Sequence, residues 1–332
     1  MIKTIKRRRL AGALAALCLL AGCAAVGSAT AASTGTTDAA RYKVALVAKS
    51  TQTDFWKAVF VGAEAAATEY NLDLTIDGPD TEEDYETQNK MIAQAVQDGA
   101  QALVFSAIDF DANAPAIEAA AQQGVKIVVI DSAVNSQNVA TYIGTDNYSA
   151  GTMAAQAALD GALGELKVGI VNYDVNSANG QDRERGAVDT FTASGRSEVV
   201  ATIHTLAEAT SAKQDTLTML RAHPEINVLL AFNEPTSVGA AQAVEELGLQ
   251  ESLWMVGFDS NLVTIDALQT GVVDALIIQN TYEMGYFGVQ SAYKLLTGQR
   301  SDLEKHVDTA TRIINRENMF ALDGQKVLFP FS

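Results

Sequence analysis

The chain has 332 residues, of which 48% are hydrophobic, and 23 Lys and Arg stand against 40 Asp and Glu, a formal net charge of −17. Such a length buries a large core without help from disulfides. The acidic balance disfavours nucleic acid and anionic membrane surfaces as partners.

The first 23 residues have the pattern of a bacterial lipoprotein signal. A basic stretch from Lys3 to Arg9 precedes the apolar run Leu10 to Leu20, and Ala21-Gly22-Cys23 follows. We predict cleavage after residue 22 and lipid attachment to Cys23, which leaves 18 Lys and Arg against 40 Asp and Glu. An ordinary secretory signal and an uncleaved anchor helix are the alternatives, but the run is far shorter than the roughly 20 residues of a spanning helix.

Residues 23–40 carry almost only small side chains and show no periodicity, so we predict a flexible tether. The mature chain would keep one thiol, that of Cys23, which excludes a disulfide and a thiolate metal site.

From Arg41 onward, short β-branched apolar runs alternate with longer segments of helical periodicity. The runs suit strands buried on both faces: Tyr42 to Ala48, Leu72 to Ile76, Ala102 to Phe105, Lys126 to Ile130, Lys167 to Val171, Val199 to His204, Val228 to Phe232, Trp254 to Phe258 and Ala275 to Ile278. Helical spacing appears in Phe55 to Tyr70, Tyr85 to Gln97, Ser149 to Ala162, Thr216 to Ala222 and Thr236 to Leu247.

This alternation predicts an α/β fold with doubly wound parallel sheets. The strands are too many for one such sheet of usual size, so we predict two lobes, with a crossing near residue 145 where Ile143-Gly144-Thr145-Asp146-Asn147 interrupts the pattern. Ligands of open parallel sheets lie outside the carboxyl ends of the strands. Two lobes whose strand ends face each other would form a cleft.

Polar residues follow most of these runs, and their chemistry suits a polyhydroxy ligand. They are Lys49, Ser50, Ser106, Asp131, Ser132, Asn233, Glu234, Asp259, Gln279 and Asn280. Each buried sugar hydroxyl needs both donors and acceptors, which these side chains supply. Phe55 and Trp56 could stack on the C–H face of a sugar ring, and Arg183 offers a planar fork to two oxygens. Singly, an Asp or Asn after a strand is equally well explained as a cap or turn residue. Phe55 and Trp56 alone are more typical of a core, and Arg183 is compatible with a solvated helix face.

Six short segments occur together in one order. They are Val44-Ala45-Leu46-Val47 with Asp54-Phe55-Trp56, Val129-Ile130-Asp131, Ile143-Gly144-Thr145-Asp146-Asn147, Arg183-Glu184-Arg185-Gly186, Ala231-Phe232-Asn233-Glu234 and Val256-Gly257-Phe258-Asp259. In these segments the chain, from about Tyr42 to Ile314, resembles the periplasmic sugar-binding proteins of the ribose and galactose type, the receptors of carbohydrate ABC importers.

The resemblance implies a role for each matching residue. Phe55 and Trp56 match an aromatic pair that sandwiches the sugar, and Asp131 matches a carboxylate that binds ring hydroxyls. Arg183 matches a ligand contact, as do Asn233, Asp259 and Gln279 in the second lobe, and Asn147 falls at the first hinge.

The resemblance also implies three crossings between lobes, near 145, 279 and 305, and closure by hinge bending. The N-terminal lobe would comprise 41–145 with about 280–305, and the C-terminal lobe 146–279 with about 306–332.

Two positions depart from the ribose type. Ser132 stands where an arginine usually follows the aspartate, and Glu234 replaces an aspartate. Lys49 would either supply the missing positive charge or reach an acidic ligand group. We expect a small neutral carbohydrate or polyol as ligand.

We therefore expect a monomeric, lipid-anchored binding protein on the outer face of the cell membrane that serves an ABC permease. A sugar receptor read by a membrane sensor kinase is the alternative. An enzyme, such as a glycosidase using Asp131 and Asp259, is disfavoured because His204, His223 and His306 are scattered and no nucleophile, phosphate-loop or metal-ligand spacing occurs. No cofactor or metal is expected.

Overall fold

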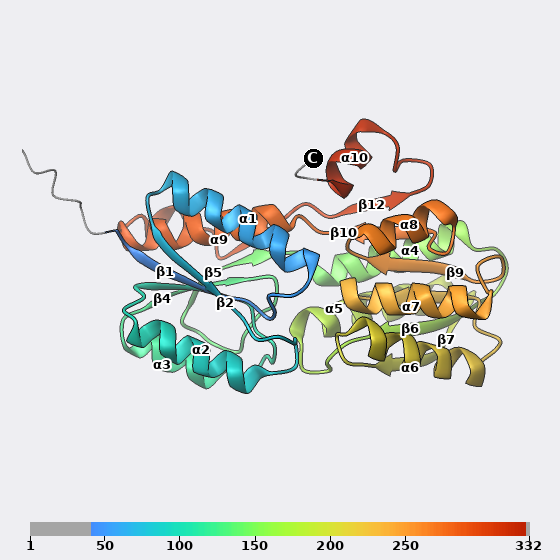
Figure 1. Cartoon of the computed structure of the whole chain (residues 1–332). Helices are drawn as coiled ribbons and strands as arrows, with labels where there is room; N and C mark the ends of the chain where they lie inside the picture. Colours follow the sequence, from blue (N-terminus) through green and yellow to red (C-terminus); the bar gives the residue numbers. More distant parts are fainter. Residues whose placement is uncertain (1–40, 330–332) are drawn as a thin grey trace, which may run out of the picture. The chain divides into compact units, whose positions relative to one another are not determined.

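The structure is a computed structural model that describes residues 41–329. The predicted signal segment, the tether and Cys23 lie outside the described residues. Figure 1 shows two α/β lobes, each built around a sheet of six strands.

The first sheet has the order β11-β5-β4-β3-β1-β2, and all its strands are parallel. They are β1 (Lys43–Val47), β2 (Asp73–Asp77), β3 (Ala102–Phe105), β4 (Lys126–Ile130), β5 (Val139–Gly144) and β11 (His306–Asp308). Helices α1 (Asp54–Glu69) and α9 (Thr281–Leu296) bury apolar side chains on one face, and α2 (Tyr85–Gln97) and α3 (Ala114–Gln122) do so on the other. A short 3-10 turn, Arg300–Asp302, follows α9.

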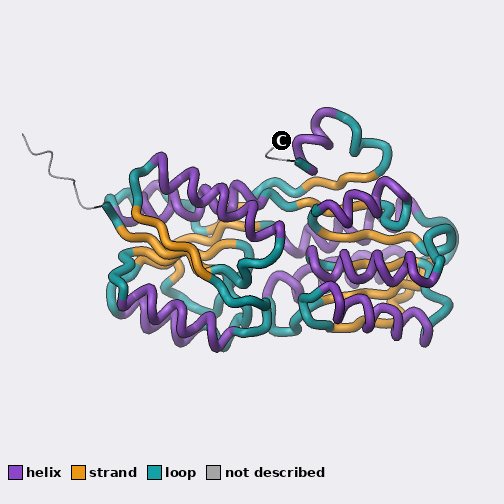
Figure 2. The backbone as a smooth tube through the Cα atoms, in the orientation of Figure 1, coloured by secondary structure: helices purple, strands orange, loops and turns teal. Residues whose placement is uncertain are grey.

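The second sheet has the order β12-β10-β9-β8-β6-β7. Its strands are β6 (Leu166–Asn172), β7 (Ser197–His204), β8 (Val228–Ala231), β9 (Trp254–Phe258), β10 (Ala275–Ile278) and β12 (Arg312–Asn315). Helices α4 (Asn147–Gly161) and α5 (Ala178–Ser194) cover one face. The other face carries α6 (Ala209–Ala222), α7 (Glu234–Leu247), α8 (Leu262–Thr270) and α10 (Leu322–Leu328). Figure 2 shows this alternation of helix and strand.

The chain passes between the lobes three times. β5 of the first sheet leads through 145–146 into α4, β10 of the second leads through 279–280 into α9, and β11 of the first leads through 309–311 into β12. The third crossing thus follows Asp308, slightly later than the expected position near 305, because β11 still pairs with β5.

Two glycines allow the returning helix α9 to lie against α1. A Cβ on Gly285 would collide with the carbonyl oxygen of Val59, and one on Gly62 would collide with that of Tyr282. This close packing makes α9 part of the first lobe, although α9 follows most of the second lobe in the sequence.

The predicted fold class of two doubly wound α/β lobes is confirmed. One strand departs from the parallel pattern: β12 pairs antiparallel with β10, because the chain enters it directly from the last crossing. Among residues 41–329, no helix is both long and apolar enough to cross a bilayer.

Candidate functional site

A small polar cavity lies where the carboxyl ends of strands from both sheets converge. Its walls are formed by Lys49, Thr53, Phe55, Trp56, Glu82, Asp131, Tyr173, Asn179, Arg183, Asn233, Glu234, Pro235, Asp259 and Gln279. The free volume is about 20 Å³, little more than a water molecule needs. The lobes are therefore closed on the site, with less room than a sugar requires.

Five of the polar residues selected from the sequence do not line this cavity. Ser106 donates to Asp131, and Asn280 caps α9. The Ser50 hydroxyl donates to the carbonyl oxygen of Asp80 and accepts from the Gln52 amide, so it shapes a loop. Ser132 is fully buried, and its hydroxyl has no partner among the described residues. Asn147 accepts a hydrogen bond from Arg183, which does line the cavity.

Asp131 and Asp259 occupy equivalent places in the two lobes, directly after β4 and β9. Both have left-handed backbone conformations, with φ of 55° and 62°. Such conformations cost energy for residues other than glycine and cluster at functional sites. Both side chains are buried: the Asp131 carboxylate accepts from Ser106 at 2.9 Å and from Asn179, whereas Asp259 accepts from Gln279 at 2.8 Å.

Arg183 lies at the centre of the polar wall and is 1% exposed. Its guanidinium donates to Asn147 at 2.9 Å, to the Phe232 carbonyl oxygen at 2.5 Å and to Gln279 at 2.7 Å. It also lies 4.6 Å from the centre of the Phe258 ring. Asn147 directly follows the first crossing, Gln279 lies in the second, and Phe232 follows β8 of the second sheet. Arg183 therefore connects both crossings to this sheet.

The sequence around Arg183 explains its position. Gly151 of α4 lies against the backbone of Arg183, and Gly186 lies against the carbonyl oxygen of Tyr148, where a Cβ at either glycine would collide. The two helices therefore pack closely enough for Arg183 to reach the first crossing. This accounts for the glycine that ends the Arg183-Glu184-Arg185-Gly186 segment.

Lys49 is engaged by protein groups. Its ammonium lies 3.1 Å from a Glu82 oxygen, donates to Ser177 at 3.0 Å and lies 5.0 Å from the centre of the Tyr173 ring. Burial alone would lower the pKa of Lys49, but Glu82, Tyr173 and Asp131 together raise it above its usual value. Lys49 therefore stays charged, and its charge is matched by Glu82.

The two aromatic residues have different surroundings. Trp56 is 1% exposed, packs in the core of the first lobe and donates from its ring nitrogen to Glu82 at 2.8 Å. The rings of Phe55 and Trp56 are 5.2 Å apart at an interplanar angle of 81°. Because the rings are nearly perpendicular, they do not form a sandwich in this closed conformation.

Sequence reasoning missed five wall residues, which are Thr53, Glu82, Tyr173, Asn179 and Pro235. Tyr173 directly follows β6, so the strand-end rule could have found it. Asn179 lies one helical turn before Arg183 on α5, a spacing that places both on one face. Glu82 lies in the acidic loop before α2, which carries no pattern that distinguishes it from its neighbours.

The site is rich in buried carboxylates. Burial raises the pKa of Asp131, against the opposing effect of Lys49 and Arg183, and burial likewise raises the pKa of Glu234. For Asp259, burial raises the pKa to about 7 although Arg183 lies nearby. Including Glu82, four carboxylates face two cations in the wall.

A larger hollow of about 550 Å³ adjoins the site and shares Phe55, Asp259 and Gln279 with it. Its remaining wall comes mainly from α8, the start of α9 and the end of α10, with apolar side chains such as Ile265 and Leu328. The smaller cavity, where the polar groups converge, is the better candidate site.

Residues 44–300 match the family described as periplasmic binding protein domain. The chain belongs to this family. It is 28% identical over 282 residues to the D-ribose/D-allose-binding protein of Pseudomonas aeruginosa, across 82% of this chain and 88% of the relative. It is 24% identical over 261 residues to the ribose import binding protein RbsB of Bacillus subtilis, across 78% and 83%.

Solved structures agree with the assignment to the periplasmic binding protein family. A carbohydrate transporter solute-binding protein from Agrobacterium radiobacter, in complex with D-arabinose, shares 26% identity with a TM-score of 0.83, across 87% of this chain and 99% of that one. An ABC transporter solute-binding protein from Agrobacterium vitis with bound D-fucose shares 27% identity and the same TM-score, across 86% and 99%. The predicted resemblance is confirmed, and the family is one of binding proteins with extracytoplasmic location.

Proposed function

We propose that this periplasmic binding protein captures a small neutral carbohydrate or polyol between its lobes and delivers it to an ABC permease. The observation that carries the proposal is the convergence of buried carboxylates, amides and one guanidinium from both sheets on a single cavity. Such groups satisfy the donors and acceptors of sugar hydroxyls. The sugar ligands of the related structures support the same ligand class.

The charges of the wall favour a neutral ligand. Lys49 was the cation most available to an anionic group, and it is occupied by Glu82 at 3.1 Å. A phosphate or sugar acid would then meet the carboxylates of Asp131, Glu234 and Asp259 in a desolvated site, where like charges repel strongly.

A thermal-shift screen tests this proposal. Pentoses, hexoses and polyols are compared with the matching sugar acids and sugar phosphates, each at several concentrations. We expect a neutral compound to stabilise the protein, by about 2.7 kcal/mol at 100 times its dissociation constant. The corresponding phosphate should leave the melting temperature unchanged. Stabilisation by anionic compounds alone would contradict the proposal.

We also propose that the protein is held at the outer face of the membrane by lipid on Cys23, the residue that follows the predicted cleavage point. Replacement by serine removes the sulfur that carries the lipid. Cys23→Ser should abolish labelling by radioactive fatty acid and release the protein from the membrane fraction. Persistent labelling and attachment in the variant would show that another feature anchors the protein.

A further inference from the structure

Glu234 joins the two lobes through its carboxylate. It is the first residue of α7 in the second lobe, yet its oxygens accept hydrogen bonds from the backbone amides of Phe55, at 2.8 Å, and Asp54, at 3.4 Å, in the first lobe. Within its own lobe it accepts from the Asn261 side chain at 2.8 Å. Three protein donors therefore occupy a side chain that sequence reasoning assigned to the ligand.

The position of this carboxylate has a clear electrostatic reason. Helix α1 begins at Asp54, and the first amides of a helix have no partner within it. Thr53 accepts from the amide of Trp56, which leaves the amides of Asp54 and Phe55 to be satisfied from outside α1. A negative charge is also favourable at a helix N-terminus. Glu234 supplies both the acceptors and the charge from across the lobe boundary.

We propose that Glu234 stabilises lobe closure through the amides of Asp54 and Phe55, and is a positioning residue that does not contact the sugar. This inference rests on the proposed function, in which closure accompanies binding. Because the Glu234 contacts join protein groups of the two lobes, they add to the stability of the closed conformation. The apparent affinity falls when the binding-competent conformation is less populated.

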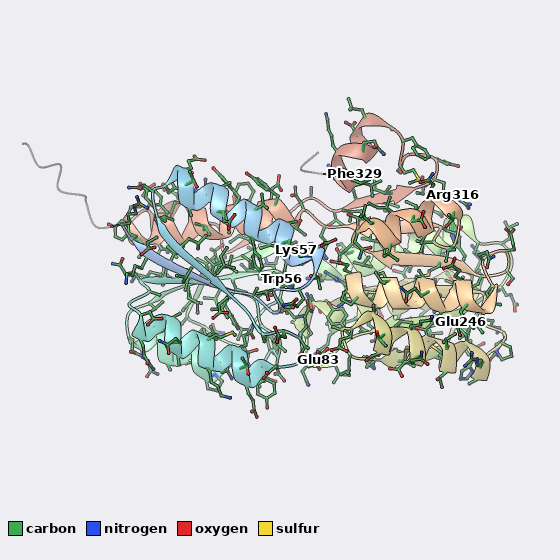
Figure 3. The ribbon with its side chains drawn as sticks, viewed as in Figure 1. Trp56, Lys57, Glu83, Glu246, Arg316 and Phe329 are labelled. Atoms are coloured by element: carbon green, nitrogen blue, oxygen red, sulfur yellow. The ribbon has the colours of Figure 1, made fainter. Side chains whose placement is uncertain are left out.

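Other hydrogen bonds also cross the boundary and mark it as a closed interface. Lys49 donates to Ser177 at 3.0 Å, and Asn179 donates to Asp131 at 3.2 Å. The Glu83 carboxylate accepts from the Ala207 amide at 2.6 Å, and the Phe110 amide donates to the carbonyl oxygen of Asn176 at 3.0 Å. Figure 3 places Glu83 near the boundary between the lobes. The contacts of Glu83 and Phe110 involve no residue of the cavity wall, whereas those of Glu234, Lys49 and Asn179 do.

The test compares Glu234→Gln and Glu234→Ala with the control Glu246→Gln. Glu246 lies on the same helix but pairs with Lys213 and Arg221 at the surface, away from the site (Figure 3). Small-angle scattering of the ligand-free full chain measures opening, and calorimetry measures affinity for a neutral sugar from the screen. We expect a larger radius of gyration for both Glu234 variants, and affinity about 10-fold weaker for Glu234→Ala, as expected for hydrogen bonds to a charged group.

An unchanged radius of gyration in both Glu234 variants would overturn the inference, whatever happens to the affinity. If the affinity fell while the radius stayed the same, Glu234 would contact the sugar directly. Scattering needs no ligand, so a failure of the proposed function, in which no sugar binds, remains distinct from a failure of the closure role. Glu234→Gln keeps the side-chain shape and serves if Glu234→Ala does not fold.

Discussion

Replacing Arg183 with methionine is expected to abolish ligand binding and to lower the free energy of unfolding by about 3–5 kcal/mol. The guanidinium is buried and donates to Asn147, Gln279 and the Phe232 carbonyl oxygen. Methionine fills part of the space but removes the guanidinium donor from Asn147, Gln279 and the Phe232 carbonyl oxygen, and it removes the cation beside Asp259. Urea unfolding and calorimetric titration measure the two effects.

Arg185→Met is the matched control for Arg183→Met. Arg185 lies on the same helix, but its side chain is 62% exposed and pairs with Asp182 at the surface. Exposed ion pairs of this kind contribute about 0–1 kcal/mol. If Arg183→Met and Arg185→Met lose similar amounts of stability and bind the ligand with similar affinity, Arg183 is not required for the structure of the site.

Replacing Asp259 with glycine is expected to stabilise the ligand-free protein while removing sugar binding. Glycine adopts the φ of 62° without strain, and the change removes a buried carboxylate whose pKa is raised to about 7. The lost bond to Gln279 offsets part of the gain. We expect a net increase of about 1–3 kcal/mol in the free energy of unfolding at pH 8.

The pH dependence provides the sharper test of Asp259. Its pKa is 3.8 in the unfolded chain and about 7 in the folded one, so the folded protein binds the extra proton between these values. The contribution of Asp259 to stability is therefore fully present below pH 3.8 and is lost as the pH rises to about 7. Burial shifts the pKa of Asp131 and Glu234 in the same direction, so Asp259→Gly should flatten the curve only partly.

Asn71→Gly is the control for backbone strain. Asn71 also has a positive φ, 50°, but its side chain carries no titratable group. This variant should change stability equally at every pH. The account is contradicted if the stability of Asp259→Gly follows the same pH dependence as the wild-type protein. It is also contradicted if Asp259→Gly is less stable than the wild-type protein at pH 8. Either result would show that the buried carboxylate does not destabilise the folded protein.

The strands were predictable because their signal is local. Runs such as Ala102–Phe105 and Trp254–Phe258 are apolar over their whole length, as strands covered on both faces must be. The strand Val139–Gly144 was not separated from the crossing that follows it. The short strands β11 and β12 were also missed, because they form at a lobe crossing through pairing with strands distant in sequence.

The cavity wall was predictable where its residues directly follow strands, as for Asp131, Asn233 and Asp259. Side-chain contacts between residues that are distant in sequence were not predictable. The sequence does not show that Lys49 meets Glu82 or that Glu234 reaches the first turn of α1, because these contacts depend on the packing of two lobes. The aromatic sandwich was expected from the resemblance to the sugar-binding family, whereas the planes of the two rings depend on how Trp56 packs in the core.

Calorimetric titration of the wild-type protein, Asp131→Ala and Asp259→Ala with the neutral sugar found by screening tests the central claim most directly. The two aspartates come from different sheets, follow β4 and β9 and line one cavity. The account predicts one sugar bound per chain and a loss of about 1–3 kcal/mol or more of binding free energy in each variant, because each leaves a buried hydroxyl unpaired. Unchanged affinity in both variants would contradict binding between the lobes.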